Sequence, residues 1–319
     1  MSYNTIISRN QNFILDSKIL YVNSDDRNIQ KYPNANCFEI NMPQSYKNIE
    51  SIRLLNIQIP SNLYNISEEL QNNKLILNGN KTIQISDGYY TIDTLETKIK
   101  NLIIEEDIPS FDIIYNKTTN KFNLSSDVDC SLSFHDISYS SCITHFKRVY
   151  EQHSKWGLGY ILGFDKYEKV NNVFDYSEPK IVNIVNDKSV TESDNFVDID
   201  NNRNIVMSID KYNKADSILP YINYTNNNSN VGLVNSVFIK IPIIKNEYNQ
   251  NFHNFESNYS NISFFQPPIT TLEKLKFEFK YDNDIPVDFK NYNITFTLEI
   301  NQISNQIKKY DVRKPFINS

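Results

Sequence analysis

A chain of 319 residues can bury a sizeable core, and its length allows one large β domain or two smaller ones, of which we expect two. Alanine occurs only at Ala35 and Ala215, whereas the chain holds 21 Tyr and 19 Phe, so the composition favours strands over helices. The formal charge of −6 argues against a dedicated nucleic-acid binder, and no apolar stretch is long enough for a membrane span or a signal peptide.

The N-terminal 18 residues are polar apart from Phe13-Ile14-Leu15, and we expect them to form an extended arm. A strand is predicted at 18–22, and an alternating strand at 37–42. Between them, Asn23 to Asn28 is rich in turn-forming residues, which favours a tight connection. Asp25 and Asp26 could instead be calcium ligands, but the segment lacks the Gly and the terminal Glu of an EF-hand loop.

Period-two alternation predicts a strand at 49–59 that ends at Pro60. Two hairpins follow, the first with strands at 74–77 and 82–85 around Asn78-Gly79-Asn80, and the second with strands at 111–115 and 121–124. Between the hairpins, apolar residues recur at three- and four-residue spacing and predict an amphipathic helix near 91–104.

The second half of the chain begins with a weaker helix prediction at 139–155. Three of the six glycines then fall in the block 156–164, where they are expected to serve backbone geometry rather than a phosphate site. Residues 165–215 are polar and patchy, which favours a linker or long loops. Further strands are predicted at 218–224, 236–244, 275–281 and 294–300, of which the last three alternate clearly.

Together these patterns predict a mainly β protein, with antiparallel sheets in a β-sandwich or jelly-roll-like arrangement and one or two short helices. We expect four parts: an N-terminal arm (1–18), a β-rich domain that contains the helix (19–200), a C-terminal β-sandwich part (201–310) and a tail (311–319).

No catalytic motif is apparent in the sequence. His145 and His153 could share a helix face, but no His-Glu-x-x-His or Cys-x-x-Cys pattern accompanies them, and Cys37, Cys130 and Cys142 are best interpreted as buried thiols in a reducing compartment. The sequence therefore predicts a protein that is not an enzyme and that needs no cofactor or metal. A hydrolase with an unfamiliar site would need a cleft that joins His145 or His153 to carboxylates.

Aromatic residues are the other candidate functional material, because Tyr and Phe supply contact area at small entropic cost. A cluster in a predicted loop could be an exposed docking surface or core beneath that loop, and the apolar residue of the arm adds a further candidate. The candidate partner-contact residues are Phe13, Tyr248, Phe252, Phe255, Tyr259, Phe264 and Phe265.

The order of several segments resembles a family of virion proteins, described as minor capsid proteins, of the nucleocytoplasmic large DNA viruses, especially the mimivirus and marine giant-virus relatives. The resemblance begins with Tyr21 to Asn28 and Lys31 to Phe38, which lead into 49–60, and it covers most of 19–301. The later matching segments are Asp87 to Thr91, Leu162-Gly163-Phe164, Phe238 to Pro242, Leu272 to Phe279 and Phe296 to Ile300.

Two segments depart from this family pattern. The chain has Phe264-Phe265-Gln266-Pro267-Pro268 where relatives tend to have an aromatic-Phe-Gly-Pro approach, and residues 165–215 match no known segment.

The resemblance implies a non-enzymatic virion structural protein, a minor capsid component that is assembled in the host cytoplasm. Its expected partners are the major capsid protein and other minor capsid proteins, with homo-oligomers possible, and no specific nucleic acid or membrane span is expected. The alternative is a virion surface module that binds a receptor or a glycan, which would predict an aromatic-lined pocket instead of broad flat interfaces.

Overall fold

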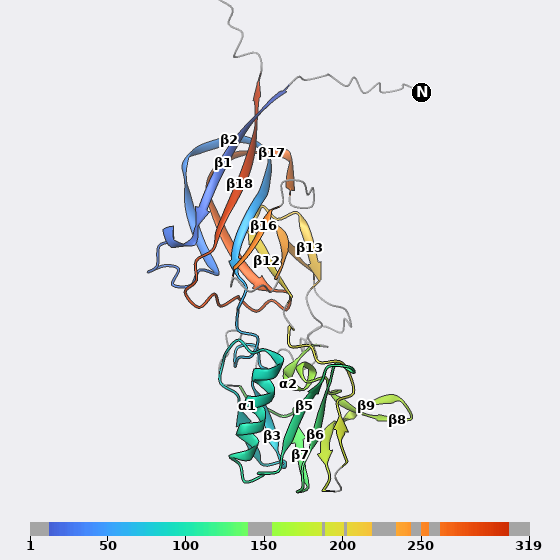
Figure 1. Cartoon of the computed structure of the whole chain (residues 1–319). Helices are drawn as coiled ribbons and strands as arrows, with labels where there is room; N and C mark the ends of the chain where they lie inside the picture. Colours follow the sequence, from blue (N-terminus) through green and yellow to red (C-terminus); the bar gives the residue numbers. More distant parts are fainter. Residues whose placement is uncertain are drawn as a thin grey trace, which may run out of the picture.

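The computed structural model describes residues 13–139, 155–186, 189–200, 203–218, 234–243, 250–254 and 262–305. Figure 1 shows an upper body of long strands and a lower body that contains both α-helices. The upper body, which we call the sheet unit, is built from 13–60 and 203–305. The lower body, the inserted unit, is built from residues between 61 and 200. None of the helices in the described part of the chain is long and apolar enough to cross a membrane.

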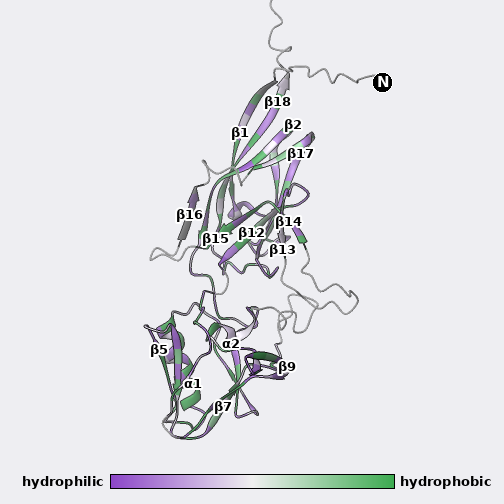
Figure 2. Ribbon diagram, turned by 90° about the vertical axis from the view of Figure 1, so that its right-hand side faces the viewer, coloured by the Kyte–Doolittle hydropathy of each residue, from purple (hydrophilic) through white to green (hydrophobic). Residues whose placement is uncertain are grey.

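One antiparallel seven-stranded sheet forms the sheet unit, in the order β1-β18-β2-β17-β12-β15, with β16 also paired to β2. Its strands are β1 (Phe13–Asn23), β2 (Cys37–Pro60), β12 (Asn204–Ile209), β15 (Ile239–Pro242), β16 (Gln250–Asn254), β17 (Ile262–Tyr281) and β18 (Thr295–Asn305). A short 3-10 helix, η1 (Ser24–Asp26), follows β1, and a separate hairpin of β13 (Ala215–Ile218) and β14 (Val234–Val237) follows β12. Figure 2 shows apolar and polar bands alternating along these strands, as expected of a sheet with one buried face.

The seven-stranded sheet doubles back over its own inner face. Phe277 of β17 pairs with Phe38, and Phe296 of β18 pairs with Ile57, at opposite ends of β2. Even so, the rings of Phe277 and Phe296 lie 4.9 Å apart in an edge-to-face contact. This contact requires the two halves of β2 to face each other, which places the core between them. The prediction of a mainly β, sandwich- or jelly-roll-like fold is therefore confirmed.

Bends in the long strands make this folding possible. β2 spans 24 residues and β17 spans 20, and their mutual register shifts between Phe264 and Ile269 and again between Leu272 and Lys274. Asn48 of β2 adopts a left-handed φ of 54° in the same region. Such irregularities bend a strand without ending it. The two strands predicted at 37–42 and 49–59 are consequently a single bent strand.

Two small antiparallel sheets and two helices, α1 (Ile92–Ile104) and α2 (Gly157–Ile161), make up the inserted unit. One sheet has the order β10-β7-β3-β4 and the other β11-β6-β5. Their strands are β3 (Lys74–Leu77), β4 (Lys81–Gln84), β5 (Asp112–Asn116), β6 (Lys121–Ser125), β7 (Cys130–Ser133), β10 (Ile181–Ile184) and β11 (Thr191–Glu192). β8 (Tyr167–Val170) and β9 (Val173–Pro179) form a hairpin of their own, which projects from the body in Figure 1.

Several locally determined elements are confirmed. The helix predicted near 91–104 is α1, whose first turn is capped reciprocally by Thr91 and Thr94. Both predicted hairpins form, as β3–β4 and β5–β6. In the glycine block, Gly157 and Gly163 have φ values of +83° and +85°, so their expected role in backbone geometry is confirmed.

The expected division of the chain is wrong, because strands from both ends form one sheet. β1 spans the predicted arm and the start of the predicted 19–200 domain, and β2 lies within that domain. Yet β1 pairs with β18, and β2 pairs with both β17 and β18, which belong to the predicted 201–310 part. The arm also ends earlier than expected, since β1 begins at Phe13. Residues 165–215 hold the strands β8 to β12 and the start of β13 rather than only a linker or loops. The helix predicted at 139–155 lies outside the described residues except for its first and last residue. The tail at 311–319 lies wholly outside them.

Candidate interaction surface

β1 forms an edge of the seven-stranded sheet and, among the described strands, pairs with β18 alone. All eleven of its residues are in unbroken register with β18, from Phe13 opposite Asn305 to Asn23 opposite Thr295. The other side of β1 presents a row of backbone N–H and C=O groups, and neither a proline nor a bulge interrupts it. Such an edge can accept a strand from another molecule.

The outer face beside this edge carries exposed apolar side chains. Leu15, Ile19 and Tyr21 alternate along β1 and are 55%, 45% and 80% exposed. Residues spaced by two lie on the same side of a strand, so these three form a stripe. The alternation is also present in the sequence, but it does not stand out there because its first half falls within the expected arm at 1–18.

The same face continues across three strands to Phe264. Directly paired residues share a face, and Ser17 pairs with Asn301, Asn301 with Ser51, and Ser51 with Phe264. Phe264 is 58% exposed. The stripe of β1 and Phe264 therefore border one continuous outer surface, which we call the neutral face.

Hydrogen bonds between uncharged groups occupy the middle of the neutral face. The Thr297 hydroxyl donates to Asn56 at 2.9 Å, and the Asn301 amide donates to the Ser51 hydroxyl at 3.1 Å. One ion pair, between Arg53 and Glu299 at 3.8 Å, lies among them. Ser51 and Thr297 are only 2% and 6% exposed, so the protein itself already shields these hydrogen bonds from water, and a partner would lose little hydration by covering them.

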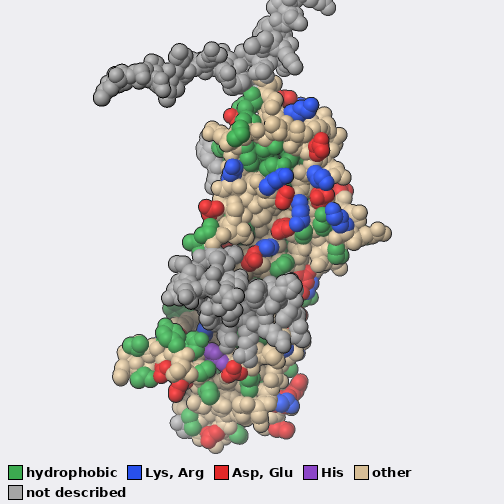
Figure 3. All heavy atoms as spheres, turned by 180° about the vertical axis from the view of Figure 1, so that it is seen from behind, with side chains coloured by type: hydrophobic (Ala, Val, Ile, Leu, Met, Phe, Trp, Pro, Cys, Tyr) green, Lys and Arg blue, Asp and Glu red, His purple; other side chains and the backbone are tan. Residues whose placement is uncertain are grey.

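The outer face of the opposite half-sheet has a different character. Along the second half of β17, Lys276 pairs with Glu278 at 2.5 Å and Lys280 with Asp284 at 2.9 Å, and Lys240 of β15 pairs with Asp282 at 2.9 Å. Figure 3 shows basic and acidic side chains interspersed over the sheet unit as seen from behind. Interspersed charges are typical of a solvated surface. Of the two outer faces, the neutral face is thus the better candidate for a protein contact.

The structure separates the candidate partner-contact residues of the aromatic cluster. Phe264 faces outward, whereas Phe265 is 6% exposed and packs against Tyr212 with ring centroids 5.9 Å apart. Phe13 lies in β1 and Phe252 in β16, but the structure describes only the backbone of these two residues. The remaining candidates, Tyr248, Phe255 and Tyr259, lie outside the described residues.

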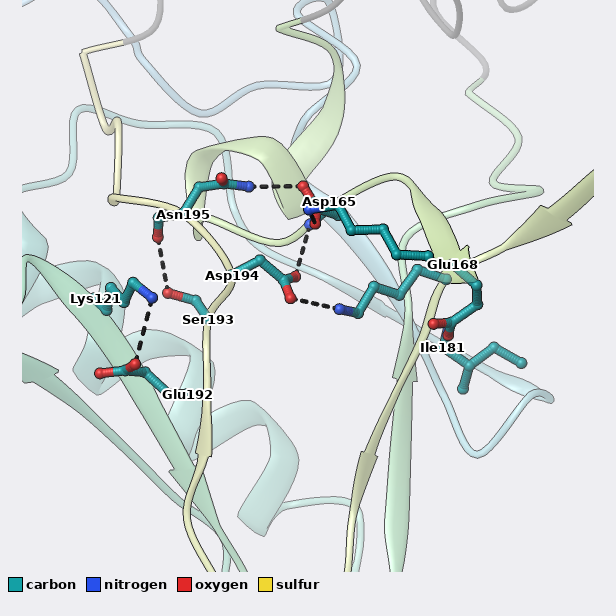
Figure 4. Close-up of polar contacts among 10 residues, drawn as sticks. Lys121, Asp165, Glu168, Ile181, Glu192, Ser193, Asp194 and Asn195 are labelled. Atoms are coloured by element: carbon teal, nitrogen blue, oxygen red, sulfur yellow. Dashed lines mark hydrogen bonds and ion pairs between the residues drawn. The ribbon is translucent and has the colours of Figure 1, made fainter. Parts of the chain in front are cut away.

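The β8–β9 hairpin is a second projecting surface, with Val170, Val173 and Tyr176 at 59%, 68% and 74% exposure. Figure 4 shows the polar contacts that hold its base. The Asp194 carboxylate accepts a hydrogen bond from the Asp165 backbone N–H at 2.9 Å and pairs with Lys180 at 2.6 Å. A single carboxylate therefore links the segments that enter and leave the hairpin.

Metal-ligating side chains do not gather in the described part of the chain. Within it, no group of three His, Cys, Asp or Glu side chains is arranged to hold a metal ion. His135 and His253 are buried, and burial raises the pKa of the thiols of Cys37 and Cys130. His145, His153 and Cys142 lie outside the described residues.

The loop considered for calcium is closed by an arginine. The Arg27 guanidinium donates to the backbone carbonyls of Ser24, Tyr32 and Pro33 at 2.7, 3.0 and 3.1 Å. The Asn23 side chain accepts from the Asp25 backbone N–H at 3.0 Å. These contacts account for the tight connection expected after the first strand.

Comparisons with known proteins give three findings. A family of unknown function, DUF5901, matches residues 8–136, which is less than half of the chain. No curated protein matches this chain. Among solved structures, the mavirus penton protein aligns at 11% identity with a TM-score of 0.45, over 92% of this chain and 100% of that one. A chain of the Sputnik virophage aligns at 10% identity with a TM-score of 0.41, over 93% and 99%. Scores and identities this low establish neither a shared fold nor a shared role.

Proposed function

We propose that this chain is a non-enzymatic structural protein of a virion, a minor capsid component that contacts major capsid subunits and other shell proteins. The observation that supports this most directly is the neutral face, which adjoins the open edge of β1. A face with exposed Leu15, Ile19, Tyr21 and Phe264, around a centre whose buried hydroxyls are hydrogen-bonded, suits a broad protein contact. The sequence resemblance to minor capsid proteins supports the same role independently.

The proposed contact has two components. The edge of β1 supplies main-chain hydrogen bonds to a strand of the partner, which set its register. The apolar side chains of the neutral face supply buried area, with Tyr21 and Phe264 as the largest anchors. The same edge could pair with β1 of a second copy, which would give a homo-oligomer.

Quantitative mass spectrometry with lysine cross-linking on purified virions tests this function. Lys18 of β1 reports on the edge, because its side chain is 40% exposed. Lys117, in the exposed turn between β5 and β6 of the inserted unit, is the matched control. We expect the chain at a fixed ratio to the major capsid protein, with more cross-links from Lys18 than from Lys117. Absence from purified particles would overturn the proposal.

A further inference from the structure

A groove with a volume of about 500 Å³ lies on the charged outer face of the sheet unit. Its floor is formed by outward-facing residues of β2 and β17, and its wall by the turn that follows β12. The residues that line it are Glu39, Asp210, Lys211, Tyr212, Thr271, Glu273, Lys274 and Lys276. This volume is in the range of small-ligand sites, roughly 300–1,000 Å³.

The turn after β12 is held rigidly against β17. The Asn213 side chain accepts from the Ile209 backbone N–H at 2.8 Å and donates to the Asp210 carbonyl at 3.0 Å. The Asp210 backbone N–H donates to the Lys276 carbonyl at 3.1 Å. Asp210 itself has a φ of +31°, which is uncommon for a residue other than glycine. The wall of the groove is thus preorganised by the chain itself.

The charges that line the groove balance, with three lysines against three carboxylates. Lys276 is paired with Glu278, and Lys274 lies 3.9 Å from Glu39. In contrast, the side chains of Asp210, Lys211 and Glu273 make no hydrogen bond or ion pair with any residue that the structure describes. The groove therefore presents both donors and acceptors to a ligand and has no net charge.

We propose that this groove binds a neutral carbohydrate. Sugar hydroxyls can donate to the carboxylates of Asp210 and Glu273 and accept from Lys211, so one ligand class satisfies groups of both signs. Balanced charge disfavours a phosphate, a sulfated sugar or a cation, each of which would leave one sign unmatched. Tyr212 supplies an aromatic surface for the C–H groups of a sugar ring, and its edge-to-face contact with Phe265 holds it in place. This site does not depend on the chain being a virion component.

Saturation-transfer NMR on the full chain tests the site, with lactose, N-acetyllactosamine, mannotriose and maltotriose as neutral probes and sialyllactose and a heparin disaccharide as anionic ones. We expect transfer to at least one neutral probe. Asp210→Asn removes the charge while retaining a residue that tolerates this φ, and Glu273→Ala removes the second acceptor. Each should weaken the affinity for that probe by about tenfold, the loss expected when a hydrogen bond to a charged group is removed.

Glu105→Ala, an exposed carboxylate at the end of α1 in the inserted unit, is the matched control and should bind like the wild type. Thermal unfolding of each variant shows whether it has kept its fold. Transfer to none of the neutral probes, transfer to the anionic probes alone, or undiminished binding by folded Asp210→Asn and Glu273→Ala would each overturn the assignment.

Discussion

Phe264 and Phe265 are consecutive residues of β17 whose side chains lie on opposite faces of the sheet. Phe264 is 58% exposed on the neutral face, whereas Phe265 is 6% exposed in the core and contacts Tyr212, which is partly buried against that core. Adjacent aromatic residues in one strand thus serve an outer surface and a core, respectively. The sequence alone places both residues in one aromatic cluster, whereas the alternation of side chains along β17 assigns Phe264 to the surface and Phe265 to the core.

The two phenylalanines should respond differently to truncation. Phe265→Ala should destabilise the sheet unit by about 3 kcal/mol, because it removes a buried ring and leaves a cavity. Phe264→Ala should change the free energy of unfolding by less than about 0.5 kcal/mol while reducing incorporation into particles. Urea unfolding and particle incorporation measure the two effects. Equal losses of stability would show that Phe264 also belongs to the core.

Gly163 should tolerate no side chain. A Cβ added there would lie 2.3 Å from the Asn195 carbonyl oxygen, and the φ of +85° is itself unfavourable for alanine. We expect Gly163→Ala to destabilise the inserted unit by more than about 2 kcal/mol. Gly79→Ala is the control, since its φ is +71° but no atom lies within 4 Å, so only the backbone cost of roughly 1 kcal/mol applies. Similar thermal shifts for both variants would contradict the close approach.

Asp194 should control how firmly the β8–β9 hairpin is attached. Asp194→Ala removes the acceptor for Lys180 and for the Asp165 backbone N–H, at a cost of about 1–3 kcal/mol. Limited proteolysis should then cleave within 165–180 faster than in the wild type. Glu178→Ala changes an exposed carboxylate of the hairpin itself and should leave the cleavage rate unchanged.

Acid should weaken the sheet unit through His253. Burial holds the pKa of this imidazole below its ordinary value, so the unfolded chain binds a proton that the folded chain resists. Stability should therefore fall as the pH drops from about 7 to about 5, and His253→Gln should make that slope shallower. Urea unfolding at several pH values measures both slopes, and parallel slopes for the two proteins would refute the assignment to His253.

The elements that the sequence predicts correctly are those that neighbouring residues in the chain determine. Asn78-Gly79 supplies the left-handed conformations of a tight turn, and the spacing of Leu95, Ile99 and Ile103 defines the buried side of α1. These signals lie within a few residues of the elements that they specify. The overall β class could also be predicted, because the scarcity of Ala and the abundance of Tyr and Phe favour strands throughout the chain.

Long-range pairing could not be predicted in this way. Nothing in the residues around Phe13 indicates that they pair with Asn305, and the polar stretch 165–215 hides strands whose partners lie elsewhere in the sequence. The neutral face was missed because it is assembled from β1, β18, β2 and β17, which the expected boundary at 200 assigned to separate domains. Phe264 was identified as a candidate, but only the pairing places it beside Ser51 and Asn301.

The pairing of β1 with β18 also constrains the order of events during synthesis. β1 leaves the ribosome well before its partner strand, which spans Thr295–Asn305 and follows the inserted unit in the chain. The inserted unit, with both ends of its chain between β2 and β12, has all of its paired strands available much earlier. It can therefore fold while β1 and the β18-facing side of β2 are still unpaired, and the larger sheet is completed only after β18 has been made.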